Sequence, residues 1–189
     1  MYKEICLLGK QAVSPNIIFK ADRQSSCLRF KILLCGRPHW GAVGGKMKEK
    51  IVLECKDKNY DFRFLGSINP RFDAGNIQTV SIKGTNYCFF SVSFPENEGI
   101  YLWILNNEIQ YIGNSVNINK QFNTGFGKIS KRNCENDGQS TNCRLNNAVY
   151  SEFLHKNKFD IYFCEIENSK SCKKLLVSQY STKYNIKRG

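Results

Sequence analysis

One stretch decides the fold: residues 99–113 read GIYLWILNNEIQYIG. The segment Gly99–Leu105 is almost wholly apolar, and the apolar pattern resumes at Ile109–Gly113 after the polar turn Asn106-Asn107-Glu108. Because so short a connection joins antiparallel neighbours, the stretch predicts a β-hairpin. This hairpin opens the second half of the chain, and the elements after it follow from their own periodicity.

The residues after the hairpin predict helices and one more strand. Leu145, Ala148, Val149 and Phe153 recur at helical spacing, which places one apolar face on a helix. The expected order is β-β-α-α-β-α. Its later elements are a short helix capped by Ser115, a polar loop over 123–138, a helix from Asn142, a strand over Phe159–Glu165 and a last helix opened by Ser169 or Ser171.

The first half of the chain predicts strands. Aromatic and β-branched residues gather in short runs that Gly, Pro, Asn and Asp separate. The expected strands are Leu28–Cys35, Ile51–Cys55, Tyr60–Leu65, Gln78–Ile82 and Tyr87–Phe94. The sequence therefore predicts an α+β protein with an antiparallel β-rich domain over 1–97 and a second domain over 99–189.

Two tripeptides on the hairpin carry a family resemblance. Gly99-Ile100-Tyr101 and Tyr111-Ile112-Gly113 lie in adjacent strands, and a short helix ending in Phe122 and the run NTGFG at 123–127 follow. This pattern resembles the GIY-YIG endonuclease superfamily, which is named for the two tripeptides. The resemblance covers residues 99–189 and implies a three-stranded antiparallel sheet flanked by helices.

The resemblance also implies a chemistry. Members of this family cleave phosphodiesters with one divalent metal ion such as Mg²⁺, which neutralises the charge that develops on the phosphate. By resemblance, Tyr101 and Tyr111 sit where the phosphate binds, and one of them positions or activates the attacking water. The family adds an arginine on the first helix, a metal-binding glutamate on the last helix, and a terminal asparagine, here Asn185, that holds the site together.

The sequence departs from the family pattern at both charged positions. Gln121 stands at the arginine position, directly before Phe122, and Lys173 stands at the glutamate position. A glutamine carries no charge to neutralise a phosphate, and a protonated lysine repels Mg²⁺ rather than binding it. We therefore expect weak or absent cleavage, unless Lys120 or Arg132 replaces the arginine and Glu152 or Glu165 supplies the metal-binding carboxylate. Glu152, on the second helix, is the better candidate for a metal ligand.

The charge of the chain favours a polyanionic partner. The net charge is +12, and residues 1–98 and 99–189 each contribute +6. A field of this sign attracts phosphates and releases counterions when nucleic acid binds. The candidate contacts around the first two helices are Lys120, Lys128, Lys131, Arg132 and Arg144. Double-stranded DNA is the partner that the resemblance favours, although the sequence does not distinguish DNA from RNA.

The cysteines and the hydropathy indicate a cytoplasmic protein. Nine cysteines at irregular spacing, without a Cys-x-x-Cys pair, are typical of reduced and buried thiols rather than of a disulfide framework. Cys134 and Cys143 form the one pair that could hold a metal or a bridge. No apolar run approaches the length that crosses a bilayer, so a membrane protein is disfavoured.

Three functional hypotheses remain open at this point. The first is a nucleic-acid-binding protein of nuclease descent with a degenerate site. The second is an active metal-dependent endonuclease, of restriction or homing type, whose site is rebuilt or carries substitutions. The third is a protein-binding module that uses its basic surface against an acidic partner. The sequence indicates neither the oligomeric state nor the role of residues 1–97, although nucleic-acid recognition would suit the arginines there.

Overall fold

The chain forms a mixed α+β structure around one curled sheet. The computed structural model describes residues 17–19, 50–135 and 139–185. The strand expected at Leu28–Cys35 lies outside these ranges, as do Cys6, Cys27 and Cys35. The α+β class that the sequence predicts is confirmed.

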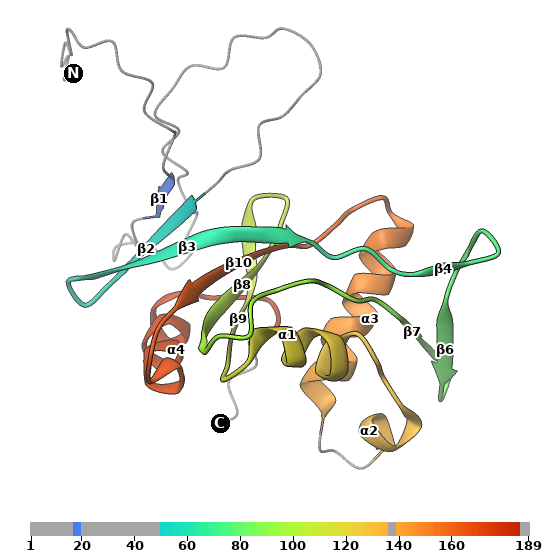
Figure 1. Cartoon of the computed structure of the whole chain (residues 1–189). Coiled ribbons are helices and arrows are strands. Elements are labelled where there is room, and N and C mark those ends of the chain that lie inside the picture. The colour runs from blue at the N-terminus through green and yellow to red at the C-terminus, as the bar shows by residue number, and fades with distance from the viewer. Residues whose placement is uncertain (1–16, 20–49, 136–138, 186–189) are drawn as a thin grey trace, which may run out of the picture.

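The sheet has six strands in the order β1-β2-β3-β10-β8-β9 (Figure 1). Its strands are β1 (Ile17–Phe19), β2 (Lys50–Cys55), β3 (Lys58–Ser67), β8 (Gly99–Leu105), β9 (Glu108–Ser115) and β10 (Asp160–Glu165). All neighbours are antiparallel except β1 and β2. Because β3 pairs with β10, the sheet continues across the boundary expected between 97 and 99, and β2 and β3 do not form a separate sheet. The functional division of the chain at that boundary stays a prediction.

The hairpin expected at residues 99–113 is present. Leu105 pairs with Glu108, and the turn between them consists of Asn106 and Asn107, with φ angles of 51° and 65°. Two consecutive left-handed residues are what a tight type I′ hairpin turn requires, and asparagine tolerates this conformation better than most residues. The neighbouring strands β9 and β10 cover both edges of β8, and helices cover both of its faces, so every residue of the strand is buried.

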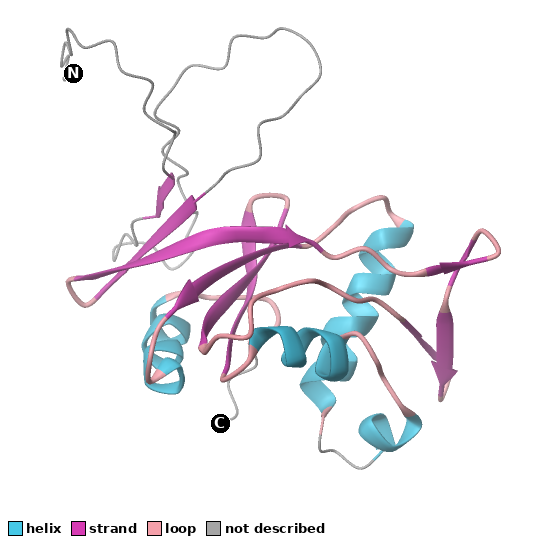
Figure 2. Ribbon diagram, in the orientation of Figure 1, coloured by secondary structure: helices cyan, strands magenta, loops and turns pink. Residues whose placement is uncertain are grey.

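Helices cover the two faces of the sheet (Figure 2), and a hydrophobic core lies on each face. Helix α4 (Ser169–Gln179) places Leu176 against Ile100, Leu102 and Ile112. On the other face, α1 (Ile118–Lys120), the π-helix η1 (Gln121–Phe126) and α3 (Ser140–Leu154) pack over Tyr101, Trp103 and Tyr111. The side chains of β8 therefore alternate between the two cores, as the period of a strand dictates. In β9, an irregularity in the pairing at Gln110 lets Ile109 and Tyr111 face different cores.

Two of the expected helix boundaries are wrong. Ser115 ends β9, and Asn117 is the residue that caps α1, since its side chain accepts a hydrogen bond from the Lys120 backbone at 2.8 Å. The polar stretch over 123–138, expected as a loop, contains most of η1 and the short helix α2 (Lys131–Glu135). α3 begins two residues before Asn142. The sequence of a polar helix end resembles that of a loop, because the apolar contacts that stabilise such an end are made with residues far away in the chain.

Two small hairpins extend from the sheet as an arm that projects beyond α3, which β7 contacts (Figure 1). They consist of β4 (Phe72–Asp73) with β5 (Asn76–Ile77), and of β6 (Thr79–Ile82) with β7 (Thr85–Cys88). The strand expected at Tyr87–Phe94 thus ends at Cys88. Beyond it, the backbone of Phe89 and Phe90 still bonds to other backbone groups, and asparagine side chains bind the backbone of Val92 and Phe94. Among the described helices, none has the length and apolarity needed to cross a membrane.

Candidate functional site

The two tyrosines of the tripeptides are neighbours, but both are buried. Their ring centroids lie 6.2 Å apart, because Tyr101 pairs with Gly113 and Trp103 pairs with Tyr111 across the hairpin. Tyr101 is 2% exposed and Tyr111 6%. Phe122 and Phe126 of η1 pack edge-on against Tyr101, at 5.2 and 6.2 Å. The resemblance placed both phenols on an open face that a phosphate could reach, and the described structure covers that face with aromatic rings.

Burial also controls the protonation of the phenols. It raises the pKa of Tyr101 well above the ordinary value of 10.0, and the neighbouring Tyr111 raises it further. The pKa of Tyr111 is raised by burial too, although Arg144 and a hydrogen bond from Tyr101 oppose the shift. A general base at neutral pH needs a pKa shifted the other way. In this arrangement neither phenol is ionised at neutral pH, so each can orient a group but cannot remove its proton.

The glycines of the two tripeptides have a packing role. A Cβ added to Gly113 would lie 2.2 Å from the ring of Tyr101, and one added to Gly99 would lie 2.3 Å from the Cys164 carbonyl. Only a hydrogen fits at either position. The tripeptides therefore let the Tyr101 ring lie flat across β9 and let β8 approach β10, independently of any ligand.

Lys173 approaches Tyr111 from α4. Its Nζ lies 5.9 Å from the centroid of the Tyr111 ring, in cation–π geometry. The side chain is half-buried, and desolvation lowers the pKa of its ammonium group from 10.5. The structure thus places a lysine beside the second tyrosine, at the position where the resemblance implies a metal-binding glutamate.

Asn185 holds the C-terminal segment against the outer edge of β9. Its side chain accepts a hydrogen bond from the Ile112 backbone N–H at 2.8 Å and donates one to the Ile112 carbonyl at 2.9 Å. Next to it, the Tyr184 N–H donates to the Gln110 carbonyl. The edge strand is therefore closed on both sides of Tyr111.

Two other asparagines make the same paired contact with a single backbone residue. Asn123 binds the N–H and carbonyl of Val92, at 2.9 and 3.0 Å, and Asn146 binds those of Cys88, at 2.9 and 2.7 Å. A carboxamide offers one acceptor and two donors, so it can replace a strand neighbour at such a position. The sequence holds 20 asparagines. Their number alone did not indicate which ones carry this role.

Arg144 is the positive charge that sequence reasoning placed elsewhere. It lies on α3, and its Nη2 donates to the Tyr184 carbonyl at 2.8 Å. This contact brings the guanidinium to the segment that covers β9, close enough for its charge to act on Tyr111. Its Nε is buried and has no hydrogen-bond partner among the described residues. The sequence had grouped Arg144 with an open basic loop.

The remaining predicted residues are not brought to the tyrosines by any described contact. Gln121 is half-buried, and its amide lies over Gly125, 2.9 Å from where a Cβ would stand. Lys120, Lys128 and Arg132 are exposed, and Lys131 pairs loosely with Glu135 at 3.9 Å. Glu152 is in the last turn of α3 and accepts a hydrogen bond from Asn157 at 2.9 Å. Within the described ranges, no three His, Cys, Asp or Glu side chains group as a metal site.

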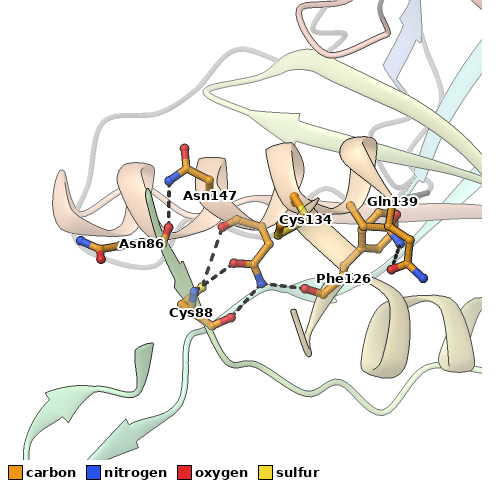
Figure 3. Close-up of a disulfide and its surroundings, with 9 residues drawn as sticks. Asn86, Cys88, Phe126, Cys134, Gln139 and Asn147 are labelled. Atoms are coloured by element: carbon orange, nitrogen blue, oxygen red, sulfur yellow. Dashed lines mark hydrogen bonds between the residues drawn. A yellow bond between two sulfur atoms is a disulfide. The ribbon is translucent and has the colours of Figure 1, made fainter. Parts of the chain in front are cut away.

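A disulfide joins Cys134 of α2 to Cys143 of α3 (Figure 3). The sequence singled out this pair for a metal or a bridge, and the bridge is present. It packs with Ile82, Tyr87 and Ile129 in a small cluster beneath the arm. The expectation of reduced, buried thiols is met by Cys55, Cys88 and Cys164 and is wrong for this pair.

Removing this disulfide should lower the free energy of unfolding by about 2–3 kcal/mol, since the bridge closes a short loop in the unfolded chain. Urea unfolding of the Cys134→Ser/Cys143→Ser variant measures the loss. Dithiothreitol should shift the wild-type curve by a similar amount and leave the curve of the double variant in place. Equal unfolding curves for the oxidised wild type and the double variant would contradict the expectation.

No protein-family model, curated protein or solved structure matches this chain.

Proposed function

We propose that this protein binds nucleic acid, with double-stranded DNA as the favoured partner, through a fold of GIY-YIG nuclease descent that does not hydrolyse its ligand. Support for the descent comes from the order of elements after residue 99 and from the placement of three residues. Tyr101 and Tyr111 lie side by side on the hairpin, and Asn185 binds the edge strand at Ile112, the residue after Tyr111.

The proposal that the protein does not cleave nucleic acid rests on one observation: the ammonium group of Lys173 lies over the Tyr111 ring. A divalent cation needs oxygen ligands, and a cationic side chain at this position repels it. The buried, protonated phenols cannot activate a water in its place. The endonuclease alternative requires a carboxylate here, and Glu152, its best candidate, is bound to Asn157 at the far end of α3.

Nucleic-acid binding is supported by exposed positive charge that lacks internal partners. In the described part of the chain, the ion pairs are Lys50 with Asp61 and Lys131 with Glu135. Lys120, Lys128 and Arg132, which surround η1 and α2, have no acidic partner there. Unpaired surface cations gain most from a polyanion, because its phosphates release their counterions on binding.

We expect the full chain to bind a DNA duplex in fluorescence anisotropy with an affinity that falls about 10²-fold between 50 and 200 mM salt, as about four phosphate contacts require. Replacing Lys120, Lys128, Lys131 and Arg132 together with alanine should remove most of this dependence. A matched variant that replaces the exposed Lys56, Lys58, Lys156 and Lys158 removes the same charge and should retain most of it.

The same preparation tests cleavage. Plasmid DNA incubated with Mg²⁺ or Mn²⁺ should stay supercoiled, at protein concentrations that saturate binding. Metal-dependent nicking that Tyr111→Phe abolishes would establish the endonuclease alternative. An absence of DNA binding at 50 mM salt would leave the protein-binding hypothesis as the better one.

A further inference from the structure

The short helix α2 depends on its disulfide for its position. Its five residues read KRNCE, and Cys134 is the one apolar residue among them. The bond joins Cys134 to Cys143 near the start of α3, as Figure 3 shows. The ion pair of Lys131 with Glu135 stays within α2 and does not tie the helix to the rest of the fold. Because a helix this short is unstable by itself in water, the covalent link to α3 is what holds it in place.

The two sulfurs of the bond differ in their access to solvent. Cys143 is 6% exposed and belongs to the cluster that also contains Ile82, Tyr87 and Ile129. Cys134 packs against this cluster and is half-buried. A thiolate opens a disulfide by attacking one of its sulfurs, so access decides which sulfur is attacked. The burial therefore favours attack at Cys134, with Cys143 as the leaving group.

The free thiols of the described chain do not compete for this bond. Burial raises the pKa of Cys88 to about 12 and the pKa of Cys164 to about 11, and it raises the pKa of Cys55 as well. These groups are protonated at neutral pH, and only a thiolate exchanges with a disulfide. Cys172 is on α4, which covers the other face of the sheet. The reactant that opens the bond must therefore come from solution.

We propose that the Cys134–Cys143 bond is a redox switch, opened by a small thiol of the glutathione kind, that positions the basic side chains of α2 for nucleic acid. In the oxidised protein, Lys131 and Arg132 are carried by a helix that is tied to α3. In the reduced protein, α2 is held by the packing of one thiol, and both cations become mobile. Ile129 stays buried, so the chain is fixed up to the residues just before α2. The inference rests on the proposed function for what these cations bind, whereas the exchange at Cys134 does not.

The exchange balances as two displacements at sulfur. The thiolate of the reductant attacks Cys134 Sγ and forms a mixed disulfide, while the bond to Cys143 breaks and Cys143 Sγ leaves with the electron pair and takes a proton. A second thiol then attacks the reductant's sulfur, and Cys134 Sγ leaves and takes the second proton. The protein gains two electrons and two protons, and the two thiols of the reductant become one disulfide.

Anisotropy titrations of the full chain, oxidised and reduced with dithiothreitol, test the switch. Reduction should weaken duplex binding about tenfold, because two mobile side chains must then be ordered on binding. The salt slope should stay the same, since reduction removes no charge. The Cys134→Ser/Cys143→Ser variant should bind like the reduced wild type with or without reductant, and Cys172→Ser should respond to reduction as the wild type does. Equal affinities of oxidised and reduced wild type would overturn the switch and leave the nucleic-acid function standing.

Backbone ¹⁵N relaxation detects the release of α2 without any ligand. On reduction, the order parameters of Lys131–Glu135 should fall below about 0.6, while those of β8, β9 and α4 stay near about 0.85, as in a folded protein. Order parameters that do not change in α2 after full reduction would overturn the inference. A loss of order throughout the chain would also overturn it, because the bond would then maintain the whole fold rather than the position of one helix.

Mass spectrometry of the native protein in oxidised glutathione identifies the sulfur that is attacked. The Cys143→Ser variant should take glutathione on Cys134, whereas the Cys134→Ser variant should take little on Cys143. A bond that stays closed in millimolar reduced glutathione would overturn the switch. Opening of the bond and release of α2, in a protein that binds no DNA at low salt, would uphold the exchange site and overturn the nucleic-acid function.

Discussion

Replacing Asn146 with leucine should lower the free energy of unfolding by about 4 kcal/mol, because three buried backbone groups lose their partners at about 1–3 kcal/mol each. Asn146 is fully buried. Its oxygen accepts from the Cys88 N–H at 2.9 Å, and its nitrogen donates to the Cys88 and Phe126 carbonyls, each at 2.7 Å. Leucine has the same branched shape as asparagine, is somewhat larger and makes none of these hydrogen bonds. Urea unfolding measures the loss.

The neighbouring residue provides the control. Asn147 is on the same helix and donates one exposed hydrogen bond to the Asn86 carbonyl at 2.8 Å (Figure 3). Asn147→Leu should therefore cost no more than about 1 kcal/mol. Similar losses for the two variants would show that burial of the amide is not what matters.

Asn146 also bears on the candidate site. By binding Phe126, it fixes the end of η1, and Phe126 is one of the rings that cover Tyr101. If the Asn146→Leu variant still folds, its Tyr101 should therefore be more exposed than in the wild type. Tyrosine fluorescence, or its quenching by iodide, would report the change.

Gly113→Ala should destabilise the protein by about 3 kcal/mol, as overpacking at a rigid position does. The added Cβ would lie 2.2 Å from two atoms of the Tyr101 ring, which Phe122 and Phe126 hold in place. The ring cannot move away without losing its contacts with Phe122 and Phe126, and the backbone of β9 cannot do so without breaking its pairing with β8. Thermal and urea unfolding both measure this cost.

A double-mutant cycle identifies the cause of that loss. In the Tyr101→Val background the ring is gone, so adding alanine at 113 should cost at least about 1 kcal/mol less than it does in the wild type. Gly125→Ala is the matched glycine control, because its Cβ would meet only the ends of two flexible side chains, the amides of Gln121 and Asn142, and alanine favours a helix. Additive effects at 101 and 113 would contradict a direct clash and would reopen a ligand-related role for the glycine.

Local patterns were enough to predict the hairpin and the last helix. Residues 99–113 hold two apolar runs on either side of a polar turn, whose two asparagines accept left-handed backbone, and both signals are contained within 15 consecutive residues. Gln121 and Lys173 could also be read directly, since a missing charge is a property of the residue itself. The α+β class followed from the same periodicities.

The site itself depends on residues far apart in the chain. Asn185 binds Ile112 across 73 positions, and Asn146 binds Cys88 across 58, so neither contact leaves a local trace. The same holds for the pairing of β3 with β10, which joins the two halves of the chain in one sheet, and for Arg144, which long-range folding brings to Tyr111.

Periodicity determines which side of an element is apolar, and the amino-acid sequence therefore specified the hairpin, the longer helices α3 and α4, and the uncharged position at 121. Burial is a different matter, because a tyrosine on an apolar face can be a ligand-binding residue or a core residue until the elements above it are placed. Here the packing of η1 over Tyr101, and the approach of α3 and α4 to Tyr111, decide between these roles.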